Sequence, residues 1–230
     1  MSSVKKNACI SFPKSGRTWL RVMLDDLGVS LEYTHAGSGH ARPKPIEQIT
    51  TATADDYERV VFLHRDPRDT AVSGYYQKAK RRDGYDGDIS SFLRDPLHGV
   101  EKICRFNRLW LEHASQDANI LAVSYEDLHA NTFHVLEAIL RFLGEDRDPD
   151  EVAEVMTANT FDKMRDREAS GAYVAKYGKA LRPTDPDDPN SFKVRKGKVG
   201  GYRDELSAED IVYCDAVIGR FGKGGVQSTT

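Results

Sequence analysis

Two segments of this chain, each preceded by an apolar run, carry side chains that could bind phosphate. In the first, the apolar residues 8–12 lead into Pro-Lys-Ser-Gly-Arg-Thr at 13–18, and a helix is expected over 18–27. A strand, a turn and a helix start in this order aim backbone N–H groups at an anion, and the helix dipole favours negative charge there. Because Lys14 and Arg17 add positive charge, this segment could form a phosphate cradle.

The second segment begins after a buried strand that is expected at 59–64. Arg65 follows the apolar core of that strand, and Ser73 lies about two turns into the helix expected over 67–82. In open α/β sheets, ligands bind beyond the carboxyl ends of the strands, and the planar guanidinium of arginine matches phosphate oxygens. The two segments together predict an anion site at each of two strand ends.

Each segment also has a simpler interpretation. The first could be an ordinary strand-to-helix turn with surface cations, and the acids and arginines at 65–69 could form capping contacts and surface ion pairs. The chain lacks the GxxxxGK[ST] pattern of nucleoside triphosphatases, and with it the Ser or Thr that binds magnesium after the lysine. This difference argues against a kinase that uses such a loop.

Positive charge is concentrated in three stretches of a chain whose net charge is −3. Residues 5–21 carry five Lys or Arg and no acid, residues 65–82 carry six against two, and residues 193–203 carry five against none. This distribution favours a site for a small anionic ligand, and the negative total argues against general nucleic-acid binding.

The pattern of apolar residues indicates a single α/β domain with a central, mainly parallel sheet and helices on both faces. Strands are expected at 8–12, 31–34, 59–64 and 119–125. Helices are expected at 18–27, 67–82, 98–115, 131–143, 149–157, 160–168 and 207–220. Residues 170–203 show little apolar periodicity, which is typical of a long functional lid or a disordered segment.

Cysteine spacing and hydropathy bear on the compartment. Cys9, Cys104 and Cys214 are widely spaced, which favours buried free thiols over a disulfide framework or a zinc site. The first residues lack the apolar core of a signal peptide, and no stretch approaches the roughly 20 apolar residues that a membrane span needs. We expect a cytoplasmic protein without a membrane span or a metal site.

Three motifs, in order along the chain, resemble those of the sulfotransferases that use 3′-phosphoadenosine 5′-phosphosulfate (PAPS). FPKSGRTWL at 12–20 resembles their 5′-phosphosulfate loop, and RDPRDTAVSGYY at 65–76 resembles their 3′-phosphate motif. FKVRKGKVGGYRDELS at 192–207 resembles the RKGxxG signature near their C-terminus. The resemblance implies one sulfotransferase domain over 1–230, a P-loop-like phosphosulfate loop after the first strand, and a mobile loop at 170–203 that closes over the donor and the acceptor.

The resemblance also implies which residues hold PAPS. The 5′-phosphosulfate would be held by Lys14, Ser15, Gly16, Arg17, Thr18 and Trp19, with the Trp19 ring stacked on adenine. The 3′-phosphate would be held by Arg65, Ser73, Arg195, Lys196 and Gly197. Tyr125 and Phe161 would contact the adenine.

The catalytic base of this family is a histidine after the second strand, and His35 matches that place. A neutral imidazole could take the proton of an acceptor hydroxyl as its oxygen attacks sulfur. His40 and His64 are alternatives, although His64 is expected to be structural. Lys14 would stabilise the charge that develops on the bridging oxygen as adenosine 3′,5′-bisphosphate (PAP) leaves.

The chain departs from the family pattern at three places. Arg17 stands where threonine is usual, and adds a cation beside the phosphosulfate. Tyr33 stands where many cytosolic members have lysine, and Arg17 could compensate for that missing cation. Gly201-Tyr202 replaces the more usual Asp-Trp after RKGxxG.

The resemblance implies in-line transfer of a sulfuryl group from PAPS to a hydroxyl group, with no metal. The alternatives are a nucleotide or small-molecule kinase of the P-loop type and a non-catalytic PAPS-binding protein. The acceptor stays open among small alcohols, phenols, glycans and lipids, and its site is expected along residues 36–58, 77–100 and 170–192. The sequence carries no signal for an oligomeric state.

Overall fold

A four-stranded parallel sheet forms the centre of the protein, in the strand order β2-β1-β3-β4. The computed structural model describes residues 5–39, 42–81 and 84–222. The strands are β1 (Ala8–Ser11), β2 (Glu32–Thr34), β3 (Val60–His64) and β4 (Ile120–Ser124). The predicted α/β class with a parallel sheet is confirmed.

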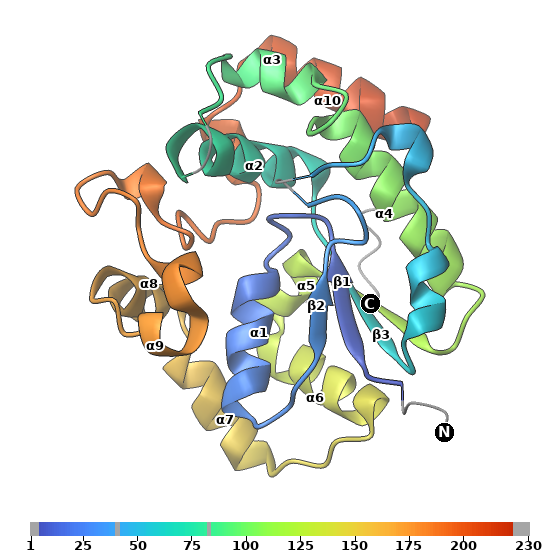
Figure 1. The fold of residues 1–230 in the computed structure, drawn as a ribbon, viewed down its shortest axis with the longest axis vertical. Helices are drawn as coiled ribbons and strands as arrows, with labels where there is room; N and C mark the ends of the chain where they lie inside the picture. Colours follow the sequence, from blue (N-terminus) through green and yellow to red (C-terminus); the bar gives the residue numbers. More distant parts are fainter. Residues whose placement is uncertain (1–4, 40–41, 82–83, 223–230) are drawn as a thin grey trace.

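Helices cover both faces of the sheet, as the sequence predicted (Figure 1). One face is covered by α1 (Arg17–Asp26), α5 (Tyr125–Ala130), α6 (Thr132–Leu143) and α7 (Pro149–Ala158). The other is covered by α2 (Pro67–Arg81), α3 (Ile89–Arg94), α4 (Val100–Ala114) and α10 (Ala208–Arg220). Two further helices, α8 (Phe161–Ala169) and α9 (Val174–Tyr177), lie beside α1 and α7.

The two central strands, β1 and β3, are buried on both faces because their side chains alternate between two cores. Ile10 and Phe62 belong to the core beneath α2, α4 and α10, whereas Cys9 and Leu63 belong to the core beneath α1 and α6. Parallel strands that are covered on both faces read as continuous apolar runs, which is why the sequence marked β3 so clearly. The strand order also places the carboxyl ends of β1 and β3 next to each other.

The segment 170–203 contains more local structure than the sequence indicated. It holds α9 and the 3₁₀ turns Gly178–Leu181 and Pro189–Ser191, and it ends within a third turn, Gly201–Asp204. A buried ion pair between Arg81 of α2 and Glu168 of α8 supports it, because Glu168 also accepts hydrogen bonds from two backbone N–H groups at 193–194. Whether this segment moves when a ligand binds stays a prediction.

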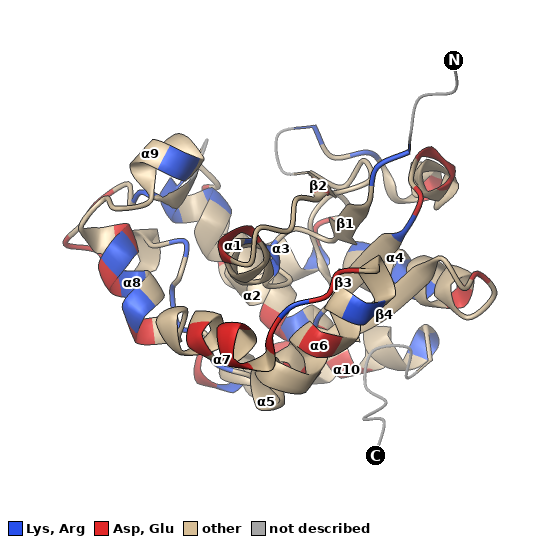
Figure 2. Ribbon diagram, turned by 90° about the horizontal axis from the view of Figure 1, so that it is seen from below, with Lys and Arg blue, Asp and Glu red and all other residues tan. Residues whose placement is uncertain are grey.

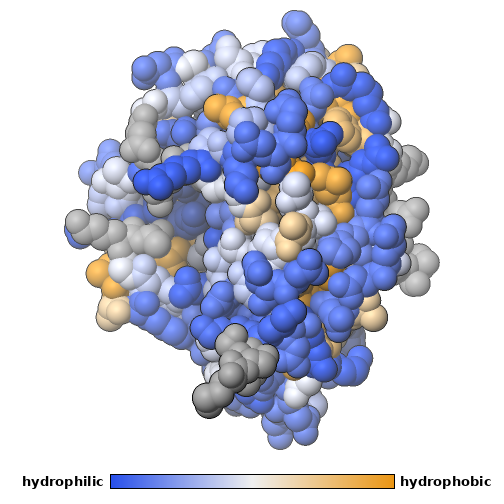
Figure 3. Space-filling model, turned by 45° about the vertical axis from the view of Figure 1, so that its right-hand side comes forward, coloured by the Kyte–Doolittle hydropathy of each residue, from blue (hydrophilic) through white to orange (hydrophobic). Residues whose placement is uncertain are grey.

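Few large apolar side chains are exposed in the part of the chain that the structure describes. Among the described residues, the large exposed ones are Leu97, Val174, Val199 and Val212, and the face in Figure 3 is mostly hydrophilic. Acidic residues gather on α7, while α8 carries charges of both signs (Figure 2). No helix in the described part of the chain has the length and hydropathy needed to span a bilayer. The three cysteines are buried and free, as expected.

His64 should make the stability of this fold depend on pH. Burial lowers the pKa of His64 to about 4, against roughly 6.5 in an unfolded chain. The unfolded state therefore binds more protons between these values, and stability falls as pH falls through that window. From pH 7 to pH 5 this one group should cost about 2 kcal/mol of unfolding free energy.

Urea denaturation at the two pH values measures this effect. Replacing His64 by phenylalanine keeps a ring beside Phe62, on which the imidazole stacks with centroids 5.7 Å apart. The variant should therefore lose about 2 kcal/mol less than the wild-type protein between pH 7 and pH 5. Equal losses in the two proteins would contradict the assignment.

Candidate active site

A cavity of about 280 Å³ opens where the carboxyl ends of β1 and β3 meet residues 192–207, called here the C-terminal segment. The strand order reverses here, because the connection after β1 leads to β2 on one side of β1 whereas β3 lies on the other side. Open α/β sheets bind ligands at such a switch point. Of the fourteen site residues predicted from the sequence, all except Ser15 line this cavity: His35, Lys14, Gly16, Arg17, Thr18, Trp19, Arg65, Ser73, Tyr125, Phe161, Arg195, Lys196 and Gly197.

The loop between β1 and α1 has the backbone of an anion cradle. Lys14 has φ 74° and Gly16 has φ 94°, so two residues of this short loop adopt left-handed conformations. Alternation of this kind turns successive N–H groups toward one side and forms a concave anion site. Ser15 lies beneath the loop with 1% of its surface exposed, and its Oγ makes no hydrogen bond with the protein.

Burial strongly affects the protonation of the Lys14 side chain. Burial lowers the pKa of the Lys14 ammonium well below its usual range, and the charges of Lys193 and Arg81 lower it further. Its Nζ donates to Gln77 Oε1 of α2 at 3.3 Å. An ammonium held in this way is stabilised by an incoming anion, which replaces the lost hydration with opposite charge.

Three aromatic rings line one wall of the cavity. Trp19 of α1 is fixed by a hydrogen bond from Nε1 to the Asn159 carbonyl, at 2.9 Å. The Trp19 ring meets Tyr125 edge-to-face with centroids 6.0 Å apart, and His129 of α5 lies against both rings. Phe161, the first residue of α8, packs where a side chain on Gly197 would otherwise lie. The wall suits a flat apolar ligand such as a base.

Gly16 is required at its position for two reasons, and its replacement by alanine should disable the cradle. The added Cβ would lie 2.3 Å from Tyr125 Cδ2, and the positive φ disfavours any side chain. We expect Gly16→Ala to bind PAP at least tenfold more weakly in calorimetry. Gly28→Ala is the matched control, because φ there is 72° and no atom lies within 4 Å of the added Cβ. Equal loss of binding in both variants would show that backbone strain alone is responsible.

Arg65 links the three basic segments at the second strand end. Its guanidinium donates to the Lys198 carbonyl at 3.0 Å and lies 4.2 Å from the centroid of the Tyr125 ring. It also pairs with Asp69 of α2 at 3.6 Å, while its Nε is buried without a hydrogen-bond partner. Ser73 lies two turns further along α2, on the same cavity. The ion pairs of the simpler interpretation do form, with Arg68 and Asp66 as a second pair, but both pairs are largely buried and do not lie on the surface.

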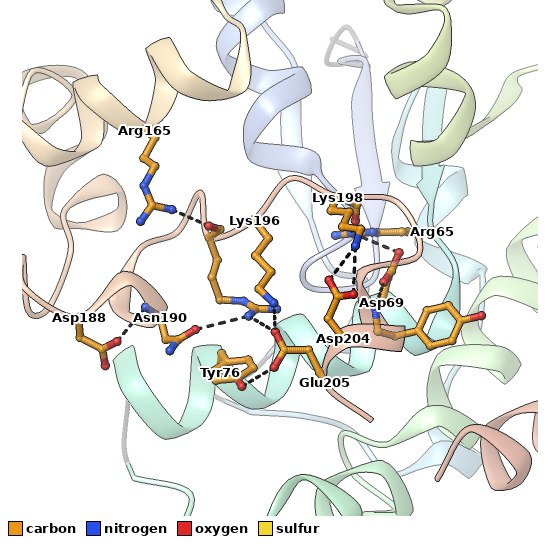
Figure 4. Close-up of polar contacts among 12 residues, drawn as sticks. Arg65, Asp69, Tyr76, Arg165, Asp188, Asn190, Lys196, Lys198, Asp204 and Glu205 are labelled. Carbon is orange, nitrogen blue, oxygen red and sulfur yellow. Dashed lines mark hydrogen bonds and ion pairs between the residues drawn. The ribbon is translucent and has the colours of Figure 1, made fainter. Parts of the chain in front are cut away.

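Arg195 and Lys196 reach the cavity from the C-terminal segment, and both pair with one carboxylate, that of Glu205. Figure 4 shows Lys196 beside Glu205. Glu205 accepts a hydrogen bond from Arg195 at 2.8 Å and another from the Tyr76 hydroxyl at 2.7 Å. Burial alone would raise the pKa of Glu205, but these hydrogen bonds and that of Lys196 lower it to about 2. The Arg195 guanidinium also stacks on Tyr76, 4.1 Å from the ring centroid.

His35 lies at the end of the cavity that is formed by β1 and β2. Its Nδ1 is 2.8 Å from the Ser11 carbonyl oxygen, which can only accept a hydrogen bond, so Nδ1 carries the proton. The Nε2 lone pair then accepts a hydrogen bond from Arg17 Nη2 at 2.8 Å. Burial lowers the pKa of His35 to about 3, and the Arg17 charge contributes in the same direction.

The other residues that were considered near the base are placed differently. His40 lies outside the described residues. His64 is the last residue of β3, is buried, and stacks on Phe62, as expected of a structural residue. Tyr33 lies on β2, and the Arg21 guanidinium lies over its ring, 5.0 Å from the centroid.

Several residues that help to form the site were not predicted from the sequence. Asp69 accepts hydrogen bonds from the N–H groups of Gly200 and Tyr202, and thereby holds the C-terminal segment against α2. Its position one turn after Arg65 was a usable signal, but the same spacing also describes a surface ion pair. Asn159 has no local sequence signal, because its role depends on the contact with Trp19. Lys193 lies in the basic stretch 193–203, but nothing in the sequence singled it out from the other cations there as a residue that lines the cavity.

Unpaired hydrogen-bond donors on the cavity wall and in the adjoining loop test whether a multiply anionic nucleotide fits these residues. Ser15 Oγ, Arg17 Nη1 and Arg65 Nε are all buried without a hydrogen-bond partner. Buried donors are costly to leave unpaired, and three of them beside Lys14 fit a ligand that carries several anionic oxygens. In the part of the chain that the structure describes, no group of three or more His, Cys, Asp or Glu side chains could hold a metal ion.

Sequence comparison identifies relatives that are named sulfotransferases. Sulfotransferase 2A1 of Rattus norvegicus is 31% identical over 181 residues, which are 75% of this chain and 60% of the rat protein. The 3-beta-hydroxysteroid sulfotransferase of Cavia porcellus is 28% identical over 241 residues, covering 90% of this chain and 80% of that protein. The chain therefore spans about 60% of the length of the rat relative.

Solved structures share the fold. Mouse sulfotransferase SULT7A1, whose crystal structure is complexed with PAP, matches with a TM-score of 0.71 at 19% identity, over 96% of this chain and 86% of that one. Retinol dehydratase, in complex with androsterone and inactive cofactor PAP, matches with a TM-score of 0.72 at 16% identity, over 97% of this chain and 82% of that one.

The family model described as "Sulfotransferase domain" matches residues 41–224. This range contains the second and third motifs, whereas the first motif and His35 precede it. Because the matched range makes up well over half of the chain, the protein belongs to the sulfotransferase family.

Proposed function

We propose that this protein transfers the sulfuryl group of PAPS to a hydroxyl group of a small acceptor. The observation that carries the proposal is the convergence of three basic segments on one cavity, where Arg17 and Arg65 each keep a buried, unpaired hydrogen-bond donor. Those hydrogen-bond donors belong to the motifs that resemble the PAPS-binding motifs of the family. The proposal also has support from the relatives, which are named sulfotransferases.

In this proposal the two ends of the cavity hold the two ends of PAPS. Lys14 and the N–H groups at the start of α1 bind the 5′-phosphosulfate, while Arg65 and Ser73 bind the 3′-phosphate with Arg195. The donor binds by displacing part of the Glu205 pairing, because Arg195 and Lys196 are shared with that carboxylate. Trp19, Tyr125 and Phe161 hold the adenine between them.

The chemistry assigned to the chain is proton transfer and charge stabilisation. His35 takes the proton of the acceptor hydroxyl at Nε2 as the acceptor oxygen forms its bond to sulfur. Lys14 stabilises the bridging oxygen, which keeps the electron pair of the breaking S–O bond as PAP leaves. Both side chains line the same cavity, as in-line transfer between them requires.

The acceptor is proposed to be a small molecule that carries a hydroxyl group. The named relatives include a 3-beta-hydroxysteroid sulfotransferase. A kinase of the P-loop type is not favoured, because the chain belongs to the sulfotransferase family and lacks the magnesium-binding Ser or Thr after the loop lysine.

Two measurements test the proposal. Calorimetry with PAP and with ATP plus magnesium separates a sulfotransferase from a kinase, and we expect binding of PAP alone at micromolar concentrations. A panel of alcohols, phenols, steroids and sugars is then incubated with PAPS, and mass spectrometry detects a sulfated product. Binding of ATP with magnesium and not of PAP would refute the proposal, whereas binding of PAP with no transfer to any acceptor would favour the non-catalytic alternative.

A further inference from the structure

Arg17 donates a hydrogen bond to the ring nitrogen with which His35 would accept a proton. Because Nδ1–H of His35 donates to the Ser11 carbonyl, the lone pair of the ring is on Nε2, and Arg17 Nη2 donates to it at 2.8 Å. A lone pair that is engaged in this way cannot take the proton of an acceptor hydroxyl. The site therefore contains its base in a blocked arrangement.

The same guanidinium has a second donor that no protein atom uses. Arg17 Nη1 is buried without a hydrogen-bond partner, and Arg17 is the first residue of α1, on the wall of the cavity beside Lys14. An anionic oxygen attracts a guanidinium more strongly than a neutral imidazole does, because a full opposite charge is added to the hydrogen bond. An anion in the cavity therefore competes with His35 for Arg17.

We propose that Arg17 is a positioning residue that keeps Nε2 of His35 occupied until the phosphosulfate of the donor draws the guanidinium away, so that His35 becomes a base only when the donor is bound. This inference rests on the proposed function. The donor shifts the population of the two arrangements of Arg17 by the difference in its affinity for them. The consequence is a fixed order, in which donor binding precedes activation of the acceptor.

The release of Nε2 completes a balanced transfer step. The acceptor O–H proton moves to His35 Nε2, the acceptor oxygen forms its bond to sulfur, and the S–O bond to the bisphosphate breaks with its electron pair on PAP. An acceptor that enters first meets an imidazole whose lone pair is already used. Threonine, the residue usual in the family at this position, has no charge with which to hold the imidazole in this way.

The surroundings of His35 determine how its protonation should respond. Arg17 of α1 and Lys193 of the C-terminal segment are the cations that act on it, and the Ser11 carbonyl at the end of β1 accepts from its Nδ1. Lys14 lines the same cavity. Among these groups, only Arg17 touches Nε2 in the described residues.

Nitrogen NMR of the full-length protein, labelled at histidine, tests the inference without an acceptor. The His35 signals are assigned with a His35→Gln variant, and the ring is titrated with and without PAP. We expect the His35 midpoint of the wild-type protein to rise by at least one pH unit when PAP binds. In Arg17→Thr the midpoint should already be higher without PAP, and PAP should raise it by less than half of the wild-type shift.

Two further variants make the outcome decisive. Arg17→Gln keeps an N–H donor without the charge, and should show the same change if Arg17→Thr folds poorly. Arg21→Thr removes a neighbouring cation of α1 that pairs with Asp25 and should leave the His35 midpoint unchanged. If PAP binds and raises the midpoint equally in wild type and in the Arg17 variants, the inference is wrong and the proposed function stands. If PAP does not bind to the wild-type protein, both are wrong.

Discussion

Replacing His35 by alanine should lower the rate of sulfuryl transfer by about 10²–10⁴-fold, the usual contribution of a general base. The physical reason is that the acceptor hydroxyl then has to lose its proton to water while its oxygen attacks sulfur. PAP affinity should not fall in this variant, because the loss of His35 frees Arg17 Nη2 for the anion. The rate is measured with an acceptor from the screen at saturating PAPS, and the affinity is measured by calorimetry.

A matched control is available on α6. The His134 side chain is 80% exposed and pairs with Glu137 at 3.6 Å, and it does not line the cavity. His134→Ala should keep the wild-type rate. An undiminished rate in His35→Ala would mean that the base lies elsewhere, and His40 would be the next histidine to replace.

The fold was predictable where the pattern of apolar residues and the capping or turn residues indicate the same element boundaries. The structure places β3 at Val60–His64 against an expected 59–64, and Asp66 caps the helix that follows through the Arg68 N–H, as its sequence indicates. Short helices were missed for the opposite reason. α3 and α5 each have six residues, which is too few for a 3.6-residue pattern to repeat.

The candidate site was predictable as a set of residues and not as a set of contacts. Arg17 and His35 are eighteen positions apart, and they meet because β1 and β2 pair in parallel with Ile10 opposite Thr34. Glu205 was not singled out, because its role depends on the fold of the segment that carries Arg195 and Lys196. Local sequence shows which side chains can bind an anion, whereas the folded chain decides which of them already have a partner.

Replacing Lys14 by alanine should lower the rate of transfer by about 10²–10³-fold, comparable to the loss of one donor to a developing oxyanion. Lys14 is buried on the cavity wall, where charge is screened poorly and stabilises a leaving oxygen more than it would in water. Lys6→Ala is the control, because the Lys6 side chain is 73% exposed and pairs with Glu32 on the surface. Lys6→Ala should keep the wild-type rate, and an equal loss in both variants would remove Lys14 from the mechanism.

The lowered pKa of Lys14 adds a signature that an inert structural lysine would not give. Burial and the Lys193 charge depress this pKa in the ligand-free protein, and a bound anion raises it again, so PAP binding should take up protons. The uptake should grow as pH rises above neutrality, where more of Lys14 is deprotonated before binding. Calorimetry at pH 8.5 in two buffers of different ionisation enthalpy measures it. The uptake should disappear in Lys14→Ala and persist in Lys6→Ala, because at this pH His35 stays neutral in both states.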